Sequence, residues 1–329
     1  MKSLVVLNEC RFSQDQINLL KRSFQNVAIY ADTTTEEQAI KRVGDRNIII
    51  MDQFVFSFGE KLLKSCPHLE LVIVNTNAYD ALDIELLNKY NVKLAHLKEY
   101  ATEDVAEVGM GMIFALNNKI EIAKKLVTNQ KTGLPGYSYD KKIYDIDLSL
   151  PIVPYLIRKP LDEQTLGIIG LGNIGKKTAE LALGLGMKVV GFNRTKKFIK
   201  GVTQLSLKKV LSNSDIIFIS LRYDKKTMKH FLKAKDLSLI KKDTHLISIA
   251  HPDLIDMQYV INNHSKFNGI GFDYLVTQEV KKLLKVRKYN IIVTPHLGHQ
   301  STKAYHNLTT TIIEAALSFG SSKELHLVN

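Results

Sequence analysis

Short runs of aliphatic and β-branched residues alternate with amphipathic stretches along the first hundred residues of the chain. Residues 13–23 and 36–43 carry apolar side chains at the spacing of one helix face. The aliphatic runs predict strands at residues 4–7, 27–30, 47–51, 71–75 and 92–95. Strands that alternate with helices are typical of βαβ units, so we expect a doubly wound α/β domain with a parallel sheet.

Residues 103–130 have acidic residues at the front, a long apolar middle and lysines near the end, which matches the dipole of a helix. We expect one long helix there. Residues 133–160 are rich in Gly, Pro and Tyr and include four prolines. Because proline cannot continue a helix, this stretch is expected to form a connecting arm.

A second series of strands and helices follows the arm. It predicts strands at residues 165–169, 188–192, 216–220, 245–249, 268–272 and 291–294. Six strands separated by helices make a complete sheet of the dinucleotide-binding type. A last helix is expected over residues 301–319, after this sheet is complete.

Length and composition limit the class of protein. A chain of 329 residues exceeds what one hydrophobic core usually serves, so two domains are expected. With 45% hydrophobic and 24% charged residues, extended disorder and fibrous structure are excluded. No run of 18 apolar residues occurs, and the apolar run near the start is too short for a signal peptide, so we expect a cytoplasmic protein without a membrane span. Cys10 and Cys66 have no spacing that suggests a disulfide framework or a metal site.

The formal net charge of +12 is unevenly placed. Residues 188–288 hold 21 lysines and arginines against 8 acidic residues, so the excess belongs to this stretch. A basic face attracts nucleotide phosphates, small carboxylates or nucleic acid, whereas scattered lysines can equally be a solvated surface. Neither a helix-turn-helix nor an aromatic RNA-binding signature is visible, which argues against nucleic acid as a partner.

A glycine fingerprint follows the strand predicted at residues 165–169. It consists of Gly170, Gly172, Asn173, Ile174 and Gly175, and it opens a helical pattern. The glycines allow a tight turn, close approach of the backbone to a pyrophosphate and close packing of helix on strand, while the helix N-terminus faces the phosphates. This context predicts a dinucleotide site.

The position that normally holds a ribose-binding carboxylate, at the end of the next strand, is Asn193. No acid stands there to bind a 2′-hydroxyl or to repel a 2′-phosphate. Arg194, Thr195 and Lys196 follow directly and favour a phosphate. The sequence therefore predicts NADP(H) as the preferred cofactor over NAD(H), unless these are only solvated turn residues.

Three further stretches complete a pattern that runs nearly end to end. They are residues 75–83 (NTNAYDALD), 101–107 (ATEDVAE) and 291–298 (IIVTPHLG). Together with the fingerprint, and in this order, they make the chain similar to the D-isomer-specific 2-hydroxyacid dehydrogenase family.

The resemblance implies an α/β architecture of two doubly wound, Rossmann-like domains with parallel sheets. One is a flavodoxin-like substrate domain of residues 1–101 and 298–329, and the other is an inserted NAD(P)-binding Rossmann domain of residues 102–297. It also implies a homodimer, to which the arm at residues 133–160 is expected to contribute.

The resemblance further implies an oxidoreductase that moves a hydride between NAD(P)H and C2 of a small anionic 2-oxo or 2-hydroxy acid. Such chemistry needs a base for the hydroxyl proton and a cation for the carboxylate and the developing oxyanion. His296, directly after a strand in Thr-Pro-His, matches the family's acid/base. The family's arginine and glutamate are replaced by His251 and Gln278, and Asp273 is expected at the cofactor.

These departures have physical consequences. Arginine is always charged and binds a carboxylate through two parallel hydrogen bonds, whereas His251 is shorter and mostly neutral at pH 7. Gln278 can hold His296 in one tautomer but lacks the charge that stabilises an imidazolium, so we expect a weaker base. Arg222 lies just past a strand and is a candidate replacement cation, or else a solvated loop charge.

Thr76, Asn77 and Ala78 resemble the family's loop whose backbone N–H groups bind the substrate carboxylate, and asparagine at 77 tolerates the left-handed backbone of the family's glycine. Two functions stay open. One is a 2-oxoacid reductase or 2-hydroxyacid dehydrogenase that uses His296 and prefers NADP(H). The other is a catalytically weak NAD(P)-binding family member that acts as a regulator or binding protein, which the double loss of arginine and glutamate favours.

Overall fold

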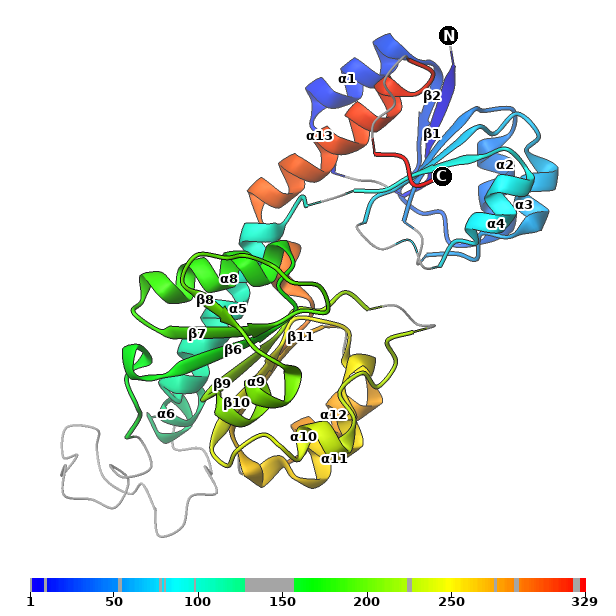
Figure 1. Cartoon of the computed structure of the whole chain (residues 1–329). Helices are drawn as coiled ribbons and strands as arrows, with labels where there is room; N and C mark the ends of the chain where they lie inside the picture. Colours follow the sequence, from blue (N-terminus) through cyan, green and yellow to red (C-terminus); the bar gives the residue numbers. More distant parts are fainter. Residues whose placement is uncertain are drawn as a thin grey trace. The chain divides into compact units, whose positions relative to one another are not determined.

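A computed structural model gives the structure of the chain. It describes residues 2–8, 11–52, 55–76, 79, 81–97, 99–127, 157–223, 227–274, 277–286, 290–321 and 326–329, without the side chains of 125–127. The chain divides into two compact units, residues 1–101 with 300–329 and residues 102–299 (Figure 1). Most of the arm expected at residues 133–160 lies outside the described residues.

The first unit is built on a five-stranded parallel sheet in the order β2-β1-β3-β4-β5. Its strands are β1 (Ser3–Val6), β2 (Gln25–Ile29), β3 (Ile48–Met51), β4 (Leu71–Val74) and β5 (Lys93–Ala95). All five strands expected here are confirmed, with ends that differ by one or two residues. The order is that of a flavodoxin-like sheet, as the sequence implies.

Helices cover both faces of this sheet. They are α1 (Gln14–Ser23), α2 (Glu36–Val43), α3 (Glu60–Ser65), α4 (Ile84–Lys89) and α13 (Thr302–Ser318). The strands are aliphatic on both sides, so alternate positions pack into two separate cores. Val5 and Ile49 share a core with α2, α3 and α4, whereas Leu4 and Ile48 share one with α1 and α13.

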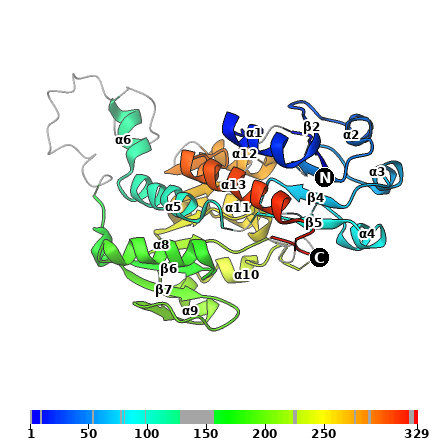
Figure 2. The ribbon, with the colours of Figure 1, turned by 90° about the horizontal axis from the view of Figure 1, so that it is seen from above.

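The last helix, α13, belongs to the first unit although it comes some 200 residues after β5. It lies alongside α1 in both views of the ribbon (Figures 1 and 2). Gln16 Nε2 donates a hydrogen bond of 2.9 Å to Thr309 Oγ1 between the two helices. Ile312 and Ile313 bury their side chains in the same core as β1 and β3.

The second unit contains a seven-stranded parallel sheet in the order β12-β11-β10-β9-β6-β7-β8. Its strands are β6 (Thr165–Ile169), β7 (Lys188–Phe192), β8 (Val202–Gln204), β9 (Ile216–Ile219), β10 (Thr244–Ser248), β11 (Phe267–Asp273) and β12 (Ile291–Thr294). The expected six strands are confirmed, but the expectation that they complete the sheet is wrong. β8 adds a seventh strand. With only three residues, two of them polar, it is too short to give a recognisable strand pattern in the sequence.

Helices again lie on both faces. They are α5 (Thr102–Asn117), α6 (Ile120–Val127), α8 (Asn173–Gly184), α9 (Leu207–Asn213), α10 (Ala234–Leu237), α11 (Met257–Asn262) and α12 (Gln278–Leu284), with short 3-10 turns η2 (Leu161–Glu163), η3 (Pro252–Leu254), η4 (His264–Lys266) and η5 (Leu297–His299). α5 and α8 cover one face, and α9 to α12 cover the other (Figure 1). The strand order reverses between β6 and β9, which is where such sheets bind ligands.

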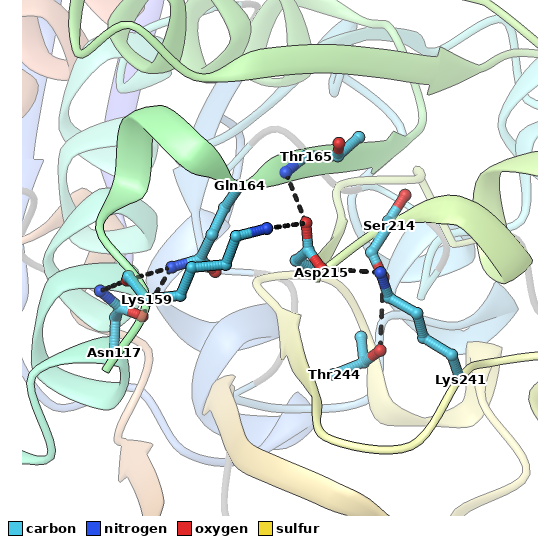
Figure 3. Close-up of polar contacts among 8 residues, drawn as sticks. All are labelled: Asn117, Lys159, Gln164, Thr165, Ser214, Asp215, Lys241 and Thr244. Carbon is cyan, nitrogen blue, oxygen red and sulfur yellow. Dashed lines mark hydrogen bonds and ion pairs between the residues drawn. The ribbon is translucent and has the colours of Figure 1, made fainter. Parts of the chain in front are cut away.

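The expectation of a single helix over residues 103–130 is wrong, because two helices, α5 and α6, occupy the described part of this range. Lys119 has a left-handed backbone (φ +53°) and separates α5 from α6. Asparagine amides compete with the helix backbone for hydrogen bonds, and two of them end α5. Asn117 turns inward, where its Oδ1 accepts from Gln164 Nε2 over 2.9 Å (Figure 3). Asn118 Nδ2 donates back to the Phe114 carbonyl.

Polar contacts also tie the N-terminal edge of this sheet together (Figure 3). Asp215, just before β9, accepts hydrogen bonds from the Thr165 N–H over 2.8 Å and from Lys241 Nζ over 2.6 Å, and Lys159 Nζ lies 3.7 Å away. Burial opposes ionisation of Asp215, but these partners outweigh it and lower the pKa of the carboxyl group. Hydrogen bonds and ion pairs of Asp215 thus connect the N-terminal ends of these strands.

A buried histidine gives this edge a pH dependence. His245 is 3% exposed, and its Nε2 contacts Asn268 Nδ2 over 3.2 Å. Burial, helped by Lys119, lowers the pKa of His245 from 6.5 to about 4, although Asp215 opposes the shift. Between about pH 6.5 and pH 4, His245 therefore binds a proton in the unfolded chain but not in the folded chain.

We expect the free energy of unfolding to be fully retained above pH 6.5 and to fall by about 3 kcal/mol towards pH 4 from this residue alone. His245→Leu removes that part of the slope. Urea unfolding followed by circular dichroism at pH 7, 5.5 and 4.5 measures it, with His68→Gln at an exposed histidine as the control. Equal slopes in the wild type and His245→Leu would contradict the assignment.

Candidate functional site

The corner between β6 and α8 gives each glycine of the fingerprint a different task. Gly170 has φ +105°, and a Cβ there would lie 2.9 Å from the Leu221 nitrogen. A Cβ on Gly175 would collide with the Gly170 carbonyl oxygen, so this glycine lets the helix approach the strand. A Cβ on Gly172 would meet nothing within 4 Å. The three positions thus supply the tight turn, the close packing and the open approach that a pyrophosphate needs.

The open side of Gly172 lies at the N-terminus of α8. Gly172 is the N-cap residue, and no side chain caps the helix from this position. Asn173 and Ile174 begin the helix, whose backbone N–H groups and dipole favour an anion. Ser220 Oγ, at the end of β9, donates to the Gly170 carbonyl over 2.9 Å and ties the turn to the neighbouring strand.

The loop after β7 presents basic side chains beside this corner. Asn193 Oδ1 accepts from the Leu171 N–H over 3.1 Å, so the loop is attached to the glycine turn itself. Asn193 Nδ2 donates to the carbonyl and hydroxyl oxygens of Thr195. Arg194, Thr195 and Lys196 are exposed. Residues 193–200 include no acidic side chain that would repel a phosphate.

A sharp turn after β12 presents His296. Its backbone is left-handed (φ +58°), and its N–H donates to the Thr294 carbonyl over 3.0 Å. Asp273, at the end of β11, is only 1% exposed and holds both sides of this turn. Its Oδ1 accepts from Thr294 Oγ1 (2.7 Å) and the Leu297 N–H (2.6 Å), and its Oδ2 accepts from the Gly298 N–H (2.9 Å). The carboxylate that the sequence places at the cofactor thus fixes the backbone around the histidine.

Aromatic and imidazole rings from neighbouring strand ends form one row. In order along the row, it comprises Tyr223, His251, Tyr274, His296 and His299. Successive ring centroids are 4.1, 4.7, 5.2 and 4.8 Å apart. The first four rings follow β9, β10, β11 and β12, which are adjacent in the sheet, so parallel pairing alone brings them to one edge.

A backbone hydrogen bond selects one tautomer of His251, the residue that the resemblance places where the family has an arginine. Its Nδ1 accepts a hydrogen bond of 3.1 Å from the Asp253 N–H, which requires an unprotonated Nδ1 and leaves the ring proton on Nε2. Tyr223 stacks on the imidazole with an interplanar angle of 15°. The Tyr223 hydroxyl also donates to Asp253 Oδ2 over 3.2 Å. Where the resemblance implies an arginine, this chain thus presents an imidazole whose Nδ1 is already used as an acceptor.

The expected partner of His296 does not reach it. Gln278 is exposed at the start of α12 and forms no hydrogen bond with His296, both of which are described residues. Tyr274 and His299 flank His296 instead. Burial, together with His296, lowers the pKa of His299, while Asp273 opposes the shift. The neighbours of His296 are therefore rings rather than a carboxylate.

Four further residues were expected at the site from the sequence: Arg222, Thr76, Asn77 and Ala78. Arg222 is exposed just after β9. Thr76 belongs to the first unit and accepts the Leu97 N–H at its carbonyl, whereas Asn77 and Ala78 lie outside the described residues. Sequence reasoning missed Tyr223, Tyr274 and His299, although the first two follow strand ends by the same rule that found His296. Within the described ranges, no group of metal-binding side chains comes together, and no helix is long and apolar enough to cross a membrane.

Comparison with known proteins agrees with this geometry. Residues 154–298 match the family model "D-isomer specific 2-hydroxyacid dehydrogenase, NAD binding domain", a range that holds the glycine corner, the basic loop and His296. Over this stretch, 145 of its 329 residues, the chain is similar to the NAD-binding domain of the D-isomer-specific 2-hydroxyacid dehydrogenases. The resemblance noted in the sequence is thereby confirmed, and a nicotinamide dinucleotide is the cofactor of such a domain.

Relatives of the family are similar over most of their length. Glycerate dehydrogenase of Methylorubrum extorquens is 28% identical over 91% of this chain and 90% of its own. Glyoxylate reductase of Thermococcus litoralis is 22% identical over 80% of this chain and 78% of its own. An acyclic imino acid reductase, solved with NADPH and D-Arg, shares the fold with a TM-score of 0.83 at 24% identity, covering 99% of this chain and 100% of the other.

The glycine corner can be tested without knowing the substrate. Gly172→Ala places a methyl group in the open space in front of α8, so we expect NADH and NADPH to bind at least ~10-fold more weakly. Stability should change by less than about 1 kcal/mol because nothing is displaced. Gly184→Ala, at the other end of α8 and equally open, is the matched control. Nucleotide fluorescence titration and thermal melts give both readouts, and unchanged binding in Gly172→Ala would refute this role of the corner.

Proposed function

We propose that the chain is an NAD(P)H-dependent reductase of small anionic 2-oxo acids, or in reverse a dehydrogenase of 2-hydroxy acids. The observation that carries the proposal is the position of His296. It stands on the same strand-end edge of one sheet as the glycine corner, on a turn fixed by the buried Asp273. An imidazole held in this way suits proton transfer to or from a substrate oxygen.

In this proposal the nicotinamide, when bound, supplies or accepts the hydride at C4. His296 donates a proton to the C2 oxygen during reduction and accepts it back during oxidation. His251 donates a neutral hydrogen bond from Nε2 to the substrate, and Asp273 acts as a positioning residue that keeps the His296 turn in place. Arg222 is the candidate cation near the same strand ends.

The proposal gives each unit a role. The unit of residues 102–299 is assigned as the cofactor domain and residues 1–101 with 300–329 as the substrate domain, two residues from the boundary at 297/298 that the resemblance implies. For the substrate carboxylate, the resemblance implies Thr76, Asn77 and Ala78, of which Thr76 is a described residue. Gln278 brings no negative charge to the site, so the imidazolium of His296 lacks the carboxylate partner of the family. A homodimer is part of the same proposal.

We further propose that NADP(H) is preferred over NAD(H). Asn193 replaces the acid that would bind a 2′-hydroxyl, and its amide is already occupied by Leu171 and Thr195. Arg194 and Lys196 are exposed beside it with no acidic neighbour in the loop. A phosphate on the ribose would find charge-assisted donors there.

Arg194→Ala is expected to raise the dissociation constant of NADPH by at least ~10-fold and that of NADH by less than ~2-fold, because only NADPH carries a 2′-phosphate for the guanidinium to bind. Lys188→Ala, at the other end of β7, should change neither. Fluorescence titration of both nucleotides with the wild type and the two variants measures the six dissociation constants. Tighter binding of NADH than of NADPH by the wild type would reject the preference.

The acid/base role predicts that His296→Ala lowers kcat by at least ~100-fold while NADPH binding stays within ~3-fold. His251→Gln should keep kcat/KM within ~10-fold, since a glutamine amide can accept the Asp253 N–H and still donate one neutral hydrogen bond. Steady-state kinetics with 2-oxo acids, including glyoxylate and hydroxypyruvate, provide the test. Full activity in His296→Ala would remove His296 from the mechanism.

The second candidate, a dinucleotide-binding regulator, is favoured by the absence of both charged partners of the family at positions 251 and 278. The same panel of 2-oxo acids separates the two functions. A wild type that is silent across the panel, combined with turnover in His251→Arg/Gln278→Glu, would select the regulator. Turnover in the wild type that disappears in His296→Ala selects the reductase.

A further inference from the structure

The strand that the sequence pattern misses, β8, ends beside the basic loop. β8 pairs in parallel with β7, and its last residue, Gln204, lies opposite Gly191 at the end of β7 from which the loop departs. Gln204 is half-buried, whereas Thr203 is exposed. The side chain of Gln204 is therefore placed against the loop rather than in solvent.

The carboxamide of Gln204 closes the loop on itself. Its Nε2 donates to the Asn193 carbonyl over 3.2 Å and to the Thr195 carbonyl over 3.3 Å. Its Oε1 accepts from the Lys197 N–H over 2.8 Å. One amide thus holds the backbone at the beginning, the middle and the end of residues 193–197.

A second amide joins this loop to the glycine corner. Asn193 Oδ1 accepts from the Leu171 N–H, and its Nδ2 donates to Thr195. The backbone of residues 193–197 is consequently fixed both to β8 and to the turn that receives the pyrophosphate. The side chains of Arg194, Lys196 and Lys197 remain exposed on this fixed backbone.

The fixed loop has the composition of a phosphate site. Residues 193–204 contain four lysines and arginines and no aspartate or glutamate. Ordering a free backbone costs conformational entropy, so a loop that is ordered in advance keeps more of the interaction energy for its ligand. Because the loop emerges from the end of β7, the part of a dinucleotide that it meets is the adenosine ribose.

We propose that Gln204 is a positioning residue that sets the selectivity of this site for a nucleotide with a phosphate monoester on the adenosine ribose. The inference rests on the proposed preference for NADP(H) and adds the residue that creates it. The task requires a side chain that donates to two carbonyls and accepts from one N–H. Glutamate of the same length can only accept when ionised, and leucine can do neither.

The test uses the full-length protein and two fragments that lack nicotinamide, adenosine 2′,5′-bisphosphate and 5′-AMP, with binding measured by calorimetry. Gln204→Leu is expected to weaken the bisphosphate by ~10-fold and 5′-AMP by less than ~2-fold, because only the bisphosphate uses the ordered basic side chains. Gln204→Glu, which has the same shape, is expected to weaken the bisphosphate further, since it also adds a negative charge. Thr203→Val on the same strand is the control and should change neither ligand.

A merely structural role for Gln204 would weaken both fragments equally, and that result overturns the proposal. The proposal is also overturned if both Gln204 variants prefer the bisphosphate over 5′-AMP as strongly as the wild type does. That outcome would leave the proposed preference for NADP(H) intact. A wild type that binds the two fragments equally rejects the preference itself and the role of Gln204 with it. If Gln204→Leu melts early, Gln204→Met, which is uncharged, similar in length and unable to make the three hydrogen bonds, supplies the same comparison.

Discussion

Parallel strand pairing constrains this molecule more than any single contact does. Every strand in the two described sheets runs in the same direction as its neighbours, so each sheet collects the C-terminal ends of its strands at one edge. In the second unit this edge receives the glycine corner after β6, the basic loop after β7 and the row of rings after β9 to β12. Gly170 and His296, which are 126 positions apart in the sequence, are thereby placed at the same end of one sheet.

The buried carboxylate of Asp273 then sets the geometry of that edge. Burying a charge is costly unless hydrogen bonds satisfy it, and three donors from residues 294–298 surround this carboxylate. The same donors flank His296, whose left-handed backbone would be unfavourable in a free chain. The three hydrogen bonds to Asp273 therefore offset both the cost of burying the carboxylate and the backbone strain at His296. Among the described residues, backbone contacts of the turn present the imidazole.

Much of this could be predicted from the sequence because the relevant signals are local. Aliphatic runs mark the long strands, and the fingerprint from Gly170 to Gly175 identifies the corner. What the sequence does not reveal depends on contacts across the sheet. β8 is too polar to stand out, and it becomes a strand because β7 offers it a partner. The break at Lys119 follows from an amide contact between Asn117 and Gln164, which are 47 positions apart.

The site shows the same division. His296 is found because it follows a strand within a recognisable motif, whereas the stacking of Tyr223 on His251 joins two loops and leaves no periodic pattern. Gln278 is expected near His296 because the resemblance places the family's glutamate at this position, yet the first turn of α12 leaves it in solvent. Spacing along a chain thus locates a loop but does not determine which way its side chains turn.

The cluster around Asp215 lies at the other end of these same strands, with Lys241, Lys159 and the start of β6. The ion pairs of Asp215 and the candidate site are therefore separated by the length of the strands. Substitutions in the Asp215 cluster should therefore change the stability of the second unit more than they change the strand ends that carry the glycine corner and His296.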